Sequence, residues 1–394
     1  MMTPIHPPTL PVHPRVLGRV HGASLGPTLV CVGGMHGNEP AGVRGLERVL
    51  AHLGSDPVGL RGQMVGLVGN RRALAQGRRF VVRDLNRMWT PEEVHRQRAR
   101  PRAEPATATD PADPDAAEQR ELDLELRRML LGALPGKAFL LDLHTTSAPG
   151  PPFVVLDDAL ANRAFALEIP VPIVLGLEEE LPGTLLYYLA GEGVVTLGFE
   201  AGQNDDPASI DRAEAAVWLA LEASGVLARG MRPEVAAARR LLAEEGRAYP
   251  HVVEVLHRHA IRPEDDFQMN PGFLSFQPVQ AGEPLATDRS GEVKASLDSL
   301  LLMPLYQEQG SDGFFLARSV EPRWLHLSAA LRRLRLVQYL HWLPGVHRDA
   351  DHPDVYLVDR RIARFLVREL FHLLGFRREG EREGKVVFKR RAHE

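Results

Sequence analysis

Cysteine is nearly missing from this sequence, and long apolar runs are missing altogether. Cys31 is the single cysteine among 394 residues, which excludes a disulfide framework within the chain and a structural zinc site built from cysteines. No stretch approaches the roughly 18 consecutive apolar residues of a membrane-spanning helix, and the proline-rich start lacks the apolar segment of a signal peptide. We therefore expect a cytoplasmic protein in which any metal is bound by histidine and carboxylate.

A strong net charge of either sign is missing as well. Lysine and arginine total 47 and aspartate and glutamate total 51, which gives a formal net charge of -4. The whole chain therefore has no field that attracts nucleic acid or an anionic membrane, and we expect neither as a partner. The P-loop and the dinucleotide-binding glycine motif are not found either. These absences favour a small-molecule substrate.

The pattern of apolar segments predicts an α/β fold. Short apolar runs, which indicate buried strands, alternate with segments of helical periodicity. This alternation favours a mixed, mostly parallel sheet flanked by helices. Strands are predicted at residues 28–33, 63–68, 138–144, 153–156, 172–175 and 194–199. Helices are predicted at residues 39–53, 118–131 and 207–223.

Changes in composition along the chain predict three units. Residues 1–228 form the α/β unit, interrupted at residues 99–116 by an exposed loop rich in alanine, proline and aspartate. Residues 229–322 form a smaller β-rich second domain, and residues 323–394 form an α-helical C-terminal extension with a terminal strand. In these last two units we predict helices at residues 233–245, 325–343 and 360–374, strands at residues 252–256 and 382–389, and turns at residues 279–284 and 291–294.

Candidate metal ligands stand where two predicted strands end. Residues 33–42 (GGMHGNEPAG) follow the first strand, and their glycines permit a tight turn that directs His36 and Glu39 to one point. A His-x-x-Glu pair alone is common by chance, but the end of a strand is where α/β sheets place ligand sites. His144 ends another apolar strand and can supply a third ligand. Two histidines and one carboxylate commonly hold catalytic zinc, so we predict one Zn²⁺ per chain.

Other polar residues have more than one reading. Asp142 precedes His144 by two residues and lies on the same side of the strand, either as a hydrogen-bond partner of a ligand histidine or as a salt-bridged core residue. Residues 79–87 (RFVVRDLNR) suit an anionic substrate or a solvated basic loop. Glu200 ends an apolar strand, where burying an acid is costly unless it has a role. It can accept a proton from an activated water.

Four motifs in order, GGMHGNEPAG, RDLNR, DLHTT and FEAG, resemble the succinylglutamate desuccinylase/aspartoacylase family between residues 29 and 202. The family's fold is similar to that of zinc carboxypeptidases. The resemblance implies that His36, Glu39 and His144 bind zinc and that Glu200 is the general base. The MPLY segment at residues 303–306 resembles the family's second domain.

The resemblance also implies how a substrate is bound. Arg79 would polarise the scissile carbonyl, and Asn86 and Arg87 would hold the α-carboxylate of the substrate. In aspartoacylase a further arginine, ten residues before the general base, holds the side-chain carboxylate of the substrate. Ala190 occupies that position here, and neither Tyr187 nor Tyr188 can replace a guanidinium. N-acetylaspartate is therefore disfavoured as the substrate.

The resemblance implies a zinc hydrolase that acts on a linear, non-peptide amide bond. The enzyme would remove the acyl group of an N-acyl amino acid or of a similar small amide that bears a carboxylate. A carboxypeptidase-like zinc peptidase is the alternative, because the same groups would serve a C-terminal peptide. A non-catalytic metal-binding protein is disfavoured, because Glu200 and Arg79 would then have no task. The sequence leaves open the two parts of the substrate, the formation of a homo-oligomer and the role of residues 323–394.

Overall fold

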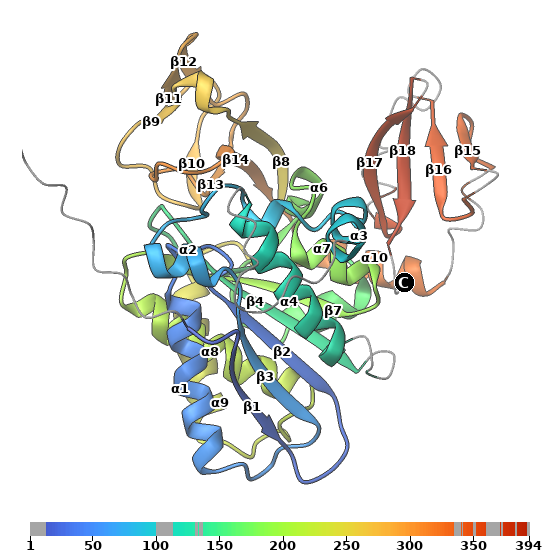
Figure 1. The fold of residues 1–394 in the computed structure, drawn as a ribbon. Coiled ribbons are helices and arrows are strands. Elements are labelled where there is room, and N and C mark those ends of the chain that lie inside the picture. The colour runs from blue at the N-terminus through green and yellow to red at the C-terminus, as the bar shows by residue number, and fades with distance from the viewer. Residues whose placement is uncertain are drawn as a thin grey trace, which may run out of the picture.

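The structure, a computed structural model, arranges the chain around one large β-sheet with helices on both faces (Figure 1). It describes residues 13–99, 113–130, 133, 137–334, 340, 342–349, 352–359, 371, 373–382 and 384–391. A three-stranded sheet lies at the top of Figure 1, and a four-stranded sheet lies at its right-hand side. The predicted α/β class, with a mixed sheet, flanking helices and a β-rich second region, is confirmed.

The large sheet has 11 strands in the order β1-β3-β2-β4-β7-β5-β6-β8-β14-β13-β10. Their bounds are β1 Val16–His21, β2 Thr28–Gly33, β3 Gln63–Val68, β4 Ala138–Thr146, β5 Phe153–Val155, β6 Ile173–Leu175, β7 Val195–Gln203, β8 Val252–Ala260, β10 Gln277–Val279, β13 Ser299–Leu302 and β14 Asp312–Ser319. The strands β3, β2, β4 and β7 are parallel, as are β5, β6 and β8. These two groups meet at the antiparallel β5–β7 pair. All strands predicted within residues 1–228 belong to this sheet.

Helices cover both faces of the sheet. α1, α8 and α9 pack on one face, and α3, α4 and α7 pack on the other (Figure 1). The helices are α1 Ala41–Ser55, α2 Arg71–Gln76, η1 Leu85–Arg87, α3 Pro91–Ala99, α4 Pro114–Leu130, α5 Leu160–Ala166, α6 Leu177–Glu180, α7 Leu185–Gly191, α8 Ala208–Ala223, α9 Pro233–Gly246, η2 Pro263–Asp265 and α10 Pro322–Arg333. The predicted loop at residues 99–116 lies mostly outside the described residues, and its last residues belong to α4.

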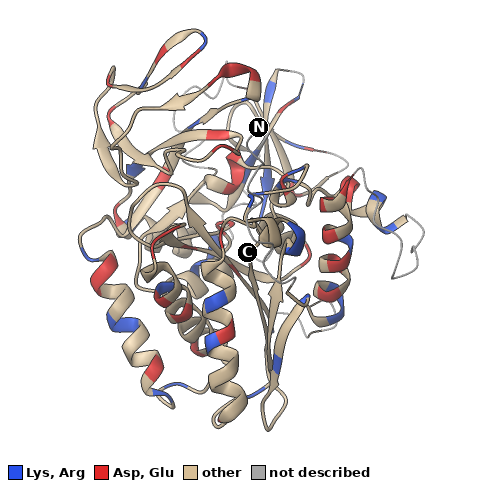
Figure 2. Ribbon diagram, turned by 60° about the vertical axis from the view of Figure 1, so that its left-hand side comes forward, with Lys and Arg blue, Asp and Glu red and all other residues tan. Residues whose placement is uncertain are grey.

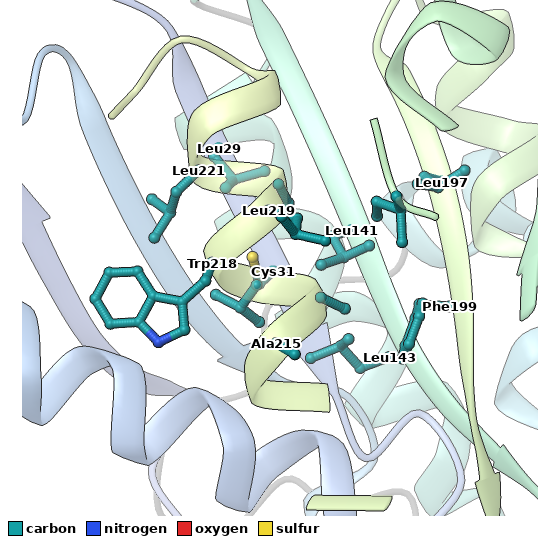
Figure 3. Packing of buried hydrophobic residues seen from close by; sticks show 14 of the residues in the cluster. Leu29, Cys31, Leu141, Leu143, Leu197, Phe199, Ala215, Trp218, Leu219 and Leu221 are labelled. Carbon is teal, nitrogen blue, oxygen red and sulfur yellow. The ribbon is translucent and has the colours of Figure 1, made fainter. Parts of the chain in front are cut away.

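The central strands read as continuous apolar runs because both of their faces are buried. In β2, Leu29 and Cys31 pack toward α1 and α8, whereas Val30 and Val32 pack toward α4 and α7. Figure 3 shows the first of these layers, in which Cys31 lies beneath α8 among leucines of the neighbouring strands. Burial raises the pKa of the Cys31 thiol, which leaves it a small buried apolar side chain.

Residues of the predicted second domain continue the large sheet and add a small one. β8 pairs with β6, and β14, β13 and β10 follow, so the sheet runs on across the boundary predicted between residues 228 and 229. β9 Gln268–Met269, β11 Pro284–Asp288 and β12 Gly291–Lys294 form the three-stranded sheet. The turn predicted at residues 291–294 is wrong, because these residues pair with β11 as a strand. Gly291, with a φ of 118°, reflects the tight hairpin that precedes the strand. The domain boundaries stay a prediction.

The C-terminal extension contains α10 and a four-stranded antiparallel sheet. The sheet has the order β15-β16-β18-β17, with bounds β15 Val346–Arg348, β16 Val355–Val358, β17 Phe376–Arg382 and β18 Lys385–Arg390. The sequence predicts only the last of these strands, and the helix predicted at residues 360–374 lies largely outside the described residues. An apolar cluster that includes Tyr356, Phe376 and Phe388 gives the extension a core of its own.

Charged residues of both signs lie side by side on the helices in Figure 2. This distribution agrees with the small net charge of the chain, which is -4. In the part of the chain that the structure describes, no helix combines the length and the apolar character needed to cross a bilayer.

Candidate active site

One cavity of about 130 Å³ lies beside the carboxyl ends of β2, β4 and β7. All side chains that the sequence singles out as site residues line it: His36, Glu39, Arg79, Asn86, Arg87, His144 and Glu200. Residues from β14 and from the segment between β13 and β14 complete its wall. The structure therefore brings the predicted residues together, while their chemical roles remain proposals.

His36, Glu39 and His144 form a buried cluster at one end of the cavity. One ligand atom from each residue lies within 4.8 Å of the ligand atoms of the other two. The Nδ1 atom of His36 is 2.8 Å from Oε1 of Glu39, and the Nδ1 atom of His144 is 3.0 Å from Oε2 of the same carboxylate. The backbone N–H of Thr145 also donates to Glu39, over 3.2 Å. The carboxylate thus stands between the two imidazoles.

The turn between β2 and α1 places His36 and Glu39 because glycine occupies its tightest points. Gly34 has a φ of 68°, in the left-handed region that favours glycine. A Cβ atom added to Gly37 would lie 2.0 Å from the carbonyl carbon of Ala73, so a side chain there would collide with α2. The predicted need for glycine in this segment is therefore confirmed at two positions.

Each imidazole of the cluster also contacts a second carboxylate. The Nε2 atom of His144 lies 3.1 Å from Oδ2 of Asp142, so the two side chains are in ionic contact, although neither Asp142 oxygen accepts a hydrogen bond from the described residues. The Nε2 atom of His36 lies 3.1 Å from Oδ1 of Asp84. Contacts of this kind orient an imidazole and leave its other nitrogen for a metal ion, if one is bound. In both rings that other nitrogen is Nδ1, the atom that faces Glu39.

Sequence reasoning assigns no role to Asp84, although the residue belongs to the RDLNR segment. Asp84 caps η1 by accepting a hydrogen bond from the backbone N–H of Asn86. An aspartate just before a short helix is the signal that marks its position. Arg79 bridges this residue and the cluster, because its guanidinium lies 3.3 Å from Glu39 Oε1 and 3.3 Å from Asp84 Oδ2.

The electrostatics of the cluster favour positive charge. Burial works against ionisation of both carboxyls, but His36 and His144 hold the pKa of Glu39 below its usual range, and His36 and Arg79 do the same for Asp84. Burial would also lower the pKa of His144, yet Asp142 and Glu39 raise it well above its usual value. A site that retains its carboxylates in ionised form and favours a cation between them has the charge that a metal site requires.

The donor set fits zinc in chemistry and in spacing. Two imidazole nitrogens and one carboxylate are a usual protein ligand set of catalytic zinc. Ligand atoms around a tetrahedral zinc ion, at bond lengths of about 2.0–2.1 Å, lie roughly 3.3 Å apart. The cluster already holds its ligand atoms within 4.8 Å of one another, with the closest pair at 2.8 Å. A zinc ion therefore needs only small side-chain shifts to be bound here.

Glu200 lies next to the cluster because of the register of two parallel strands. In the β4–β7 pair, Glu200 is the partner of His144, so both side chains leave the sheet on the same side. Burial and the charge of Glu39 raise the pKa of Glu200 to about 8, although His144 acts in the opposite direction. The Oε2 atom of Glu200 is buried and accepts no hydrogen bond. This carboxyl is thus available to exchange a proton with a molecule in the cavity.

Asn86 and Arg87 present donors to the cavity from η1. The side-chain oxygen of Asn86 accepts a hydrogen bond from the backbone N–H of Leu185, over 2.9 Å, which leaves the amide NH₂ group for a ligand. One terminal nitrogen of Arg87 lies 2.7 Å from Oδ2 of Asp312, and its Nε is buried without a partner. Asp312, which the sequence does not reveal as a site residue, also accepts a hydrogen bond from Arg258, over 2.6 Å.

The residues around the position of the missing family arginine do not replace it. Ala190 is buried in α7 and does not line the cavity. Tyr188 accepts a hydrogen bond from Arg98, and the ring of Tyr187 lies under the guanidinium of Arg377 at 4.1 Å. In the MPLY segment, Met303 and Leu305 line the cavity, whereas the Tyr306 hydroxyl donates outside it to the carbonyl of Asn270.

Comparisons with known proteins agree with this geometry. The family model of the succinylglutamate desuccinylase/aspartoacylase catalytic domain matches residues 25–221. A succinylglutamate desuccinylase of Pseudomonas paraeruginosa is 38% identical over 64 residues, which make up 16% of this chain and 19% of that protein. The match therefore spans about a fifth of the length of this curated relative.

Solved structures show the same fold at low identity. A succinylglutamate desuccinylase/aspartoacylase from Rhodobacter sphaeroides has a TM-score of 0.54 and 17% identity, covering 78% of this chain and 88% of that one. A succinylglutamate desuccinylase from Vibrio parahaemolyticus has a TM-score of 0.50 and 18% identity, covering 75% of this chain and 82% of that one.

Proposed function

We propose, from the premise that this chain belongs to the succinylglutamate desuccinylase/aspartoacylase family, that it is a zinc-dependent amidohydrolase. The proposed reaction hydrolyses the amide bond of an N-acyl amino acid, or of a similar small amide bearing a carboxylate, and releases the acyl group. One observation carries this proposal: His36, Glu39 and His144 converge in a single cavity with Glu200 beside them.

Glu200 is the proposed proton carrier. Water adds to the carbonyl carbon of the amide, the C–N bond breaks, and a carboxylate and an amine result. A zinc ion held by the cluster would lower the pKa of that water and polarise the carbonyl. Glu200 accepts a proton from the water and passes it to the leaving nitrogen. Its buried Oε2 accepts no hydrogen bond from the described residues, so this oxygen is available for the proton.

Arg79, Asn86 and Arg87 are proposed to position the substrate. The guanidinium of Arg79 is held beside the cluster by Glu39 and Asp84, where it can donate to the oxygen that gains negative charge in the transition state. Asn86 and Arg87 line the cavity, Asn86 keeps its amide NH₂ group for a ligand, and a carboxylate matches the guanidinium of Arg87 in charge and in shape. The cavity of about 130 Å³ suits a small substrate.

A carboxypeptidase-like peptidase is the competing proposal, because the same donors would accept the carboxylate of a C-terminal peptide. We therefore propose to purify the full chain, measure its zinc content, and assay N-acyl amino acids and C-terminal dipeptides in parallel. Hydrolysis of N-acyl amino acids with one zinc per chain is expected. Hydrolysis of the peptides alone would favour the peptidase.

The Glu200→Gln variant makes the test specific for the proposed mechanism. Glutamine has nearly the same shape but cannot accept the proton, so the variant should keep its zinc and lose turnover. Zinc binding without hydrolysis in the wild type would support a non-catalytic metal-binding protein. Turnover by the zinc-loaded variant at the wild-type rate would exclude Glu200 as the proton carrier.

A further inference from the structure

The end of the cavity away from the zinc ligands has acidic residues in its wall. Asp157 follows β5, and Glu178 lies in the first turn of α6; both line the cavity. Apolar side chains surround them there, among them Leu177 and Leu181. An ionised carboxylate in an apolar wall is costly unless a cation or a donor compensates it.

The protein itself supplies one cation to this acidic end. Arg391, directly after β18 in the C-terminal extension, contacts Asp157 Oδ1, and its terminal nitrogens lie 2.7 Å from Glu178 Oε1 and 2.7 Å from Glu179 Oε1. Asp157, Glu178 and Glu179 thus all contact this guanidinium, and Glu179 also accepts a hydrogen bond from the backbone N–H of Arg378. The neighbouring Asp158 does not contact Arg391 but forms ion pairs with Arg163 and Arg332.

One carboxylate oxygen in this group remains without a partner. Oε2 of Glu178 is buried and accepts no hydrogen bond, and the side chain of Glu178 is 7% exposed. Burial raises the pKa of Glu178 to about 7, and the charges of Glu179 and Asp157 act in the same direction against Arg391. A positive group that donates to this oxygen would supply the missing hydrogen bond and would favour the ionised form of Glu178.

We propose that Asp157 and Glu178 form a subsite for a protonated amine of the substrate, held in place by Arg391 of the C-terminal extension. The inference rests on the proposed deacylase function and adds the substrate class. Asn86 and Arg87 take the carboxylate of the substrate, and the acidic end takes a cationic side chain. An N-acyl amino acid with a terminal amine meets both requirements, and it also agrees with Ala190 in place of a carboxylate-binding arginine.

Two isosteric substrates test the charge alone. Nα-acyl-ornithine and Nα-acyl-norleucine have side chains of the same length that end in an ammonium and a methyl group. We would assay both with the zinc-loaded full chain, each as the acetyl and the succinyl derivative, together with the lysine and glutamate analogues. If the ammonium group forms one charge-assisted hydrogen bond in the subsite, kcat/KM should be about 10- to 100-fold higher for the acyl-ornithine than for the acyl-norleucine. Equal values, or a preference for glutamate, would overturn the subsite while leaving the deacylase proposal intact.

Matched variants assign the preference to particular carboxylates. Asp157→Asn and Glu178→Gln should each reduce the ratio of ornithine to norleucine kcat/KM, and the double variant should bring it close to one. Glu179→Gln is the control, because Glu179 contacts the same guanidinium but does not line the cavity. This control should retain the wild-type ratio. A ratio that persists in the double variant would place the recognition elsewhere.

A binding measurement separates the subsite from the reaction. Calorimetry with the free amino acids ornithine and norleucine does not depend on turnover. Tighter binding of ornithine by the wild type, lost in the double variant, would support the subsite even if no N-acyl amino acid were hydrolysed, a result that would end the proposed function alone. Equal binding of the two amino acids would end the subsite.

Discussion

The two ends of the cavity are built from different parts of the chain. At one end, the candidate metal ligands His36, Glu39 and His144 and the adjacent Glu200 come from residues 36–200, within the segment that the family model matches. At the acidic end, Asp157 and Glu178 from that segment contact Arg391 near the chain terminus. The first end is organised by neighbouring strands of one sheet, whereas the second depends on docking of an additional sheet. If the two proposals hold, the extension contributes to substrate choice while the proposed catalytic residues lie outside it.

Removal of a zinc ligand should have the largest effect and should affect the zinc end alone. His144→Ala leaves two ligands, and three protein ligands are the usual number at a catalytic zinc. We expect loss of both bound zinc and activity, measured by metal analysis and by hydrolysis of the best N-acyl substrate. The docking of the extension should stay as in the wild type, which limited proteolysis can check. Full zinc content in this variant would contradict the proposed ligand set.

Removal of Arg391 should break the acidic end. Arg391→Met leaves three buried carboxylates without their shared cation, and breaking a buried ion pair on one side costs about 3–5 kcal/mol. We expect a lower thermal midpoint and faster proteolysis of the extension, with zinc still bound. Arg382→Met, at an exposed arginine of the same sheet, is the control and should change little. Stability equal to that of the wild type would show that Arg391 does not hold the extension.

The acidic end should also respond to pH in a direction set by Glu178. The pKa of this carboxyl in the folded protein is raised to about 7 from its ordinary value of 4.5. The protonated form is therefore favoured by folding, and its contribution to stability is lost as pH rises from about 4.5 to 7. Relative to Glu178→Gln, the wild type should lose roughly 1–3 kcal/mol across that range. The measurement is the free energy of unfolding of both proteins between pH 5 and 8. The same dependence on pH in the two proteins would contradict this expectation.

Replacing the carboxylate that contacts His36 or the one that contacts His144 should have a smaller effect. Asp84→Asn should weaken zinc binding by about 10- to 100-fold, because the amide orients His36 less firmly than a carboxylate does. Competition with a chelator measures the affinity, and Asp142→Asn provides the same test for His144. The ornithine preference should stay unchanged, which would keep the two ends of the cavity distinct. Unaltered zinc affinity in both variants would remove these carboxylates from the account of the site.

The grouping of His36, Glu39, His144 and Glu200 could be predicted from the sequence because these residues lie at or just after the ends of apolar strands. His144 and Glu200 each end such a strand, and the carboxyl ends of parallel strands meet at one edge of a sheet. Glycine spacing located the turn that holds His36 and Glu39. The alternation of apolar and helical segments predicted the sheet and its two helix layers for the same physical reason, since both faces of the central strands are buried.

The acidic end could not be predicted in this way. The spacing of apolar residues along the sequence indicates which residues are buried. It does not indicate which charged residue, distant in the sequence, contacts a buried side chain. Arg391 and Asp157 are separated by 234 positions, and nothing local to either residue indicates the other. The contact between Arg87 and Asp312 could not be predicted for the same reason. In the extension, the sequence predicted a terminal strand but not β15, β16 or β17, which lie outside the two segments predicted as helices and are too short for their periodicity to mark them.

The pairing of His144 with Glu200 across β4 and β7 has a consequence for how the protein can vary. Hydrogen bonds between the two strands set the spacing of ligand and base, so no loop has to close to bring them together. A residue inserted early in β7 would shift the register by one position. Glu200 would then point into the apolar layer beneath α8, and Phe199 would point toward the proposed zinc ligands. The register of β4 and β7 is therefore the feature on which the proximity of His144 and Glu200 depends.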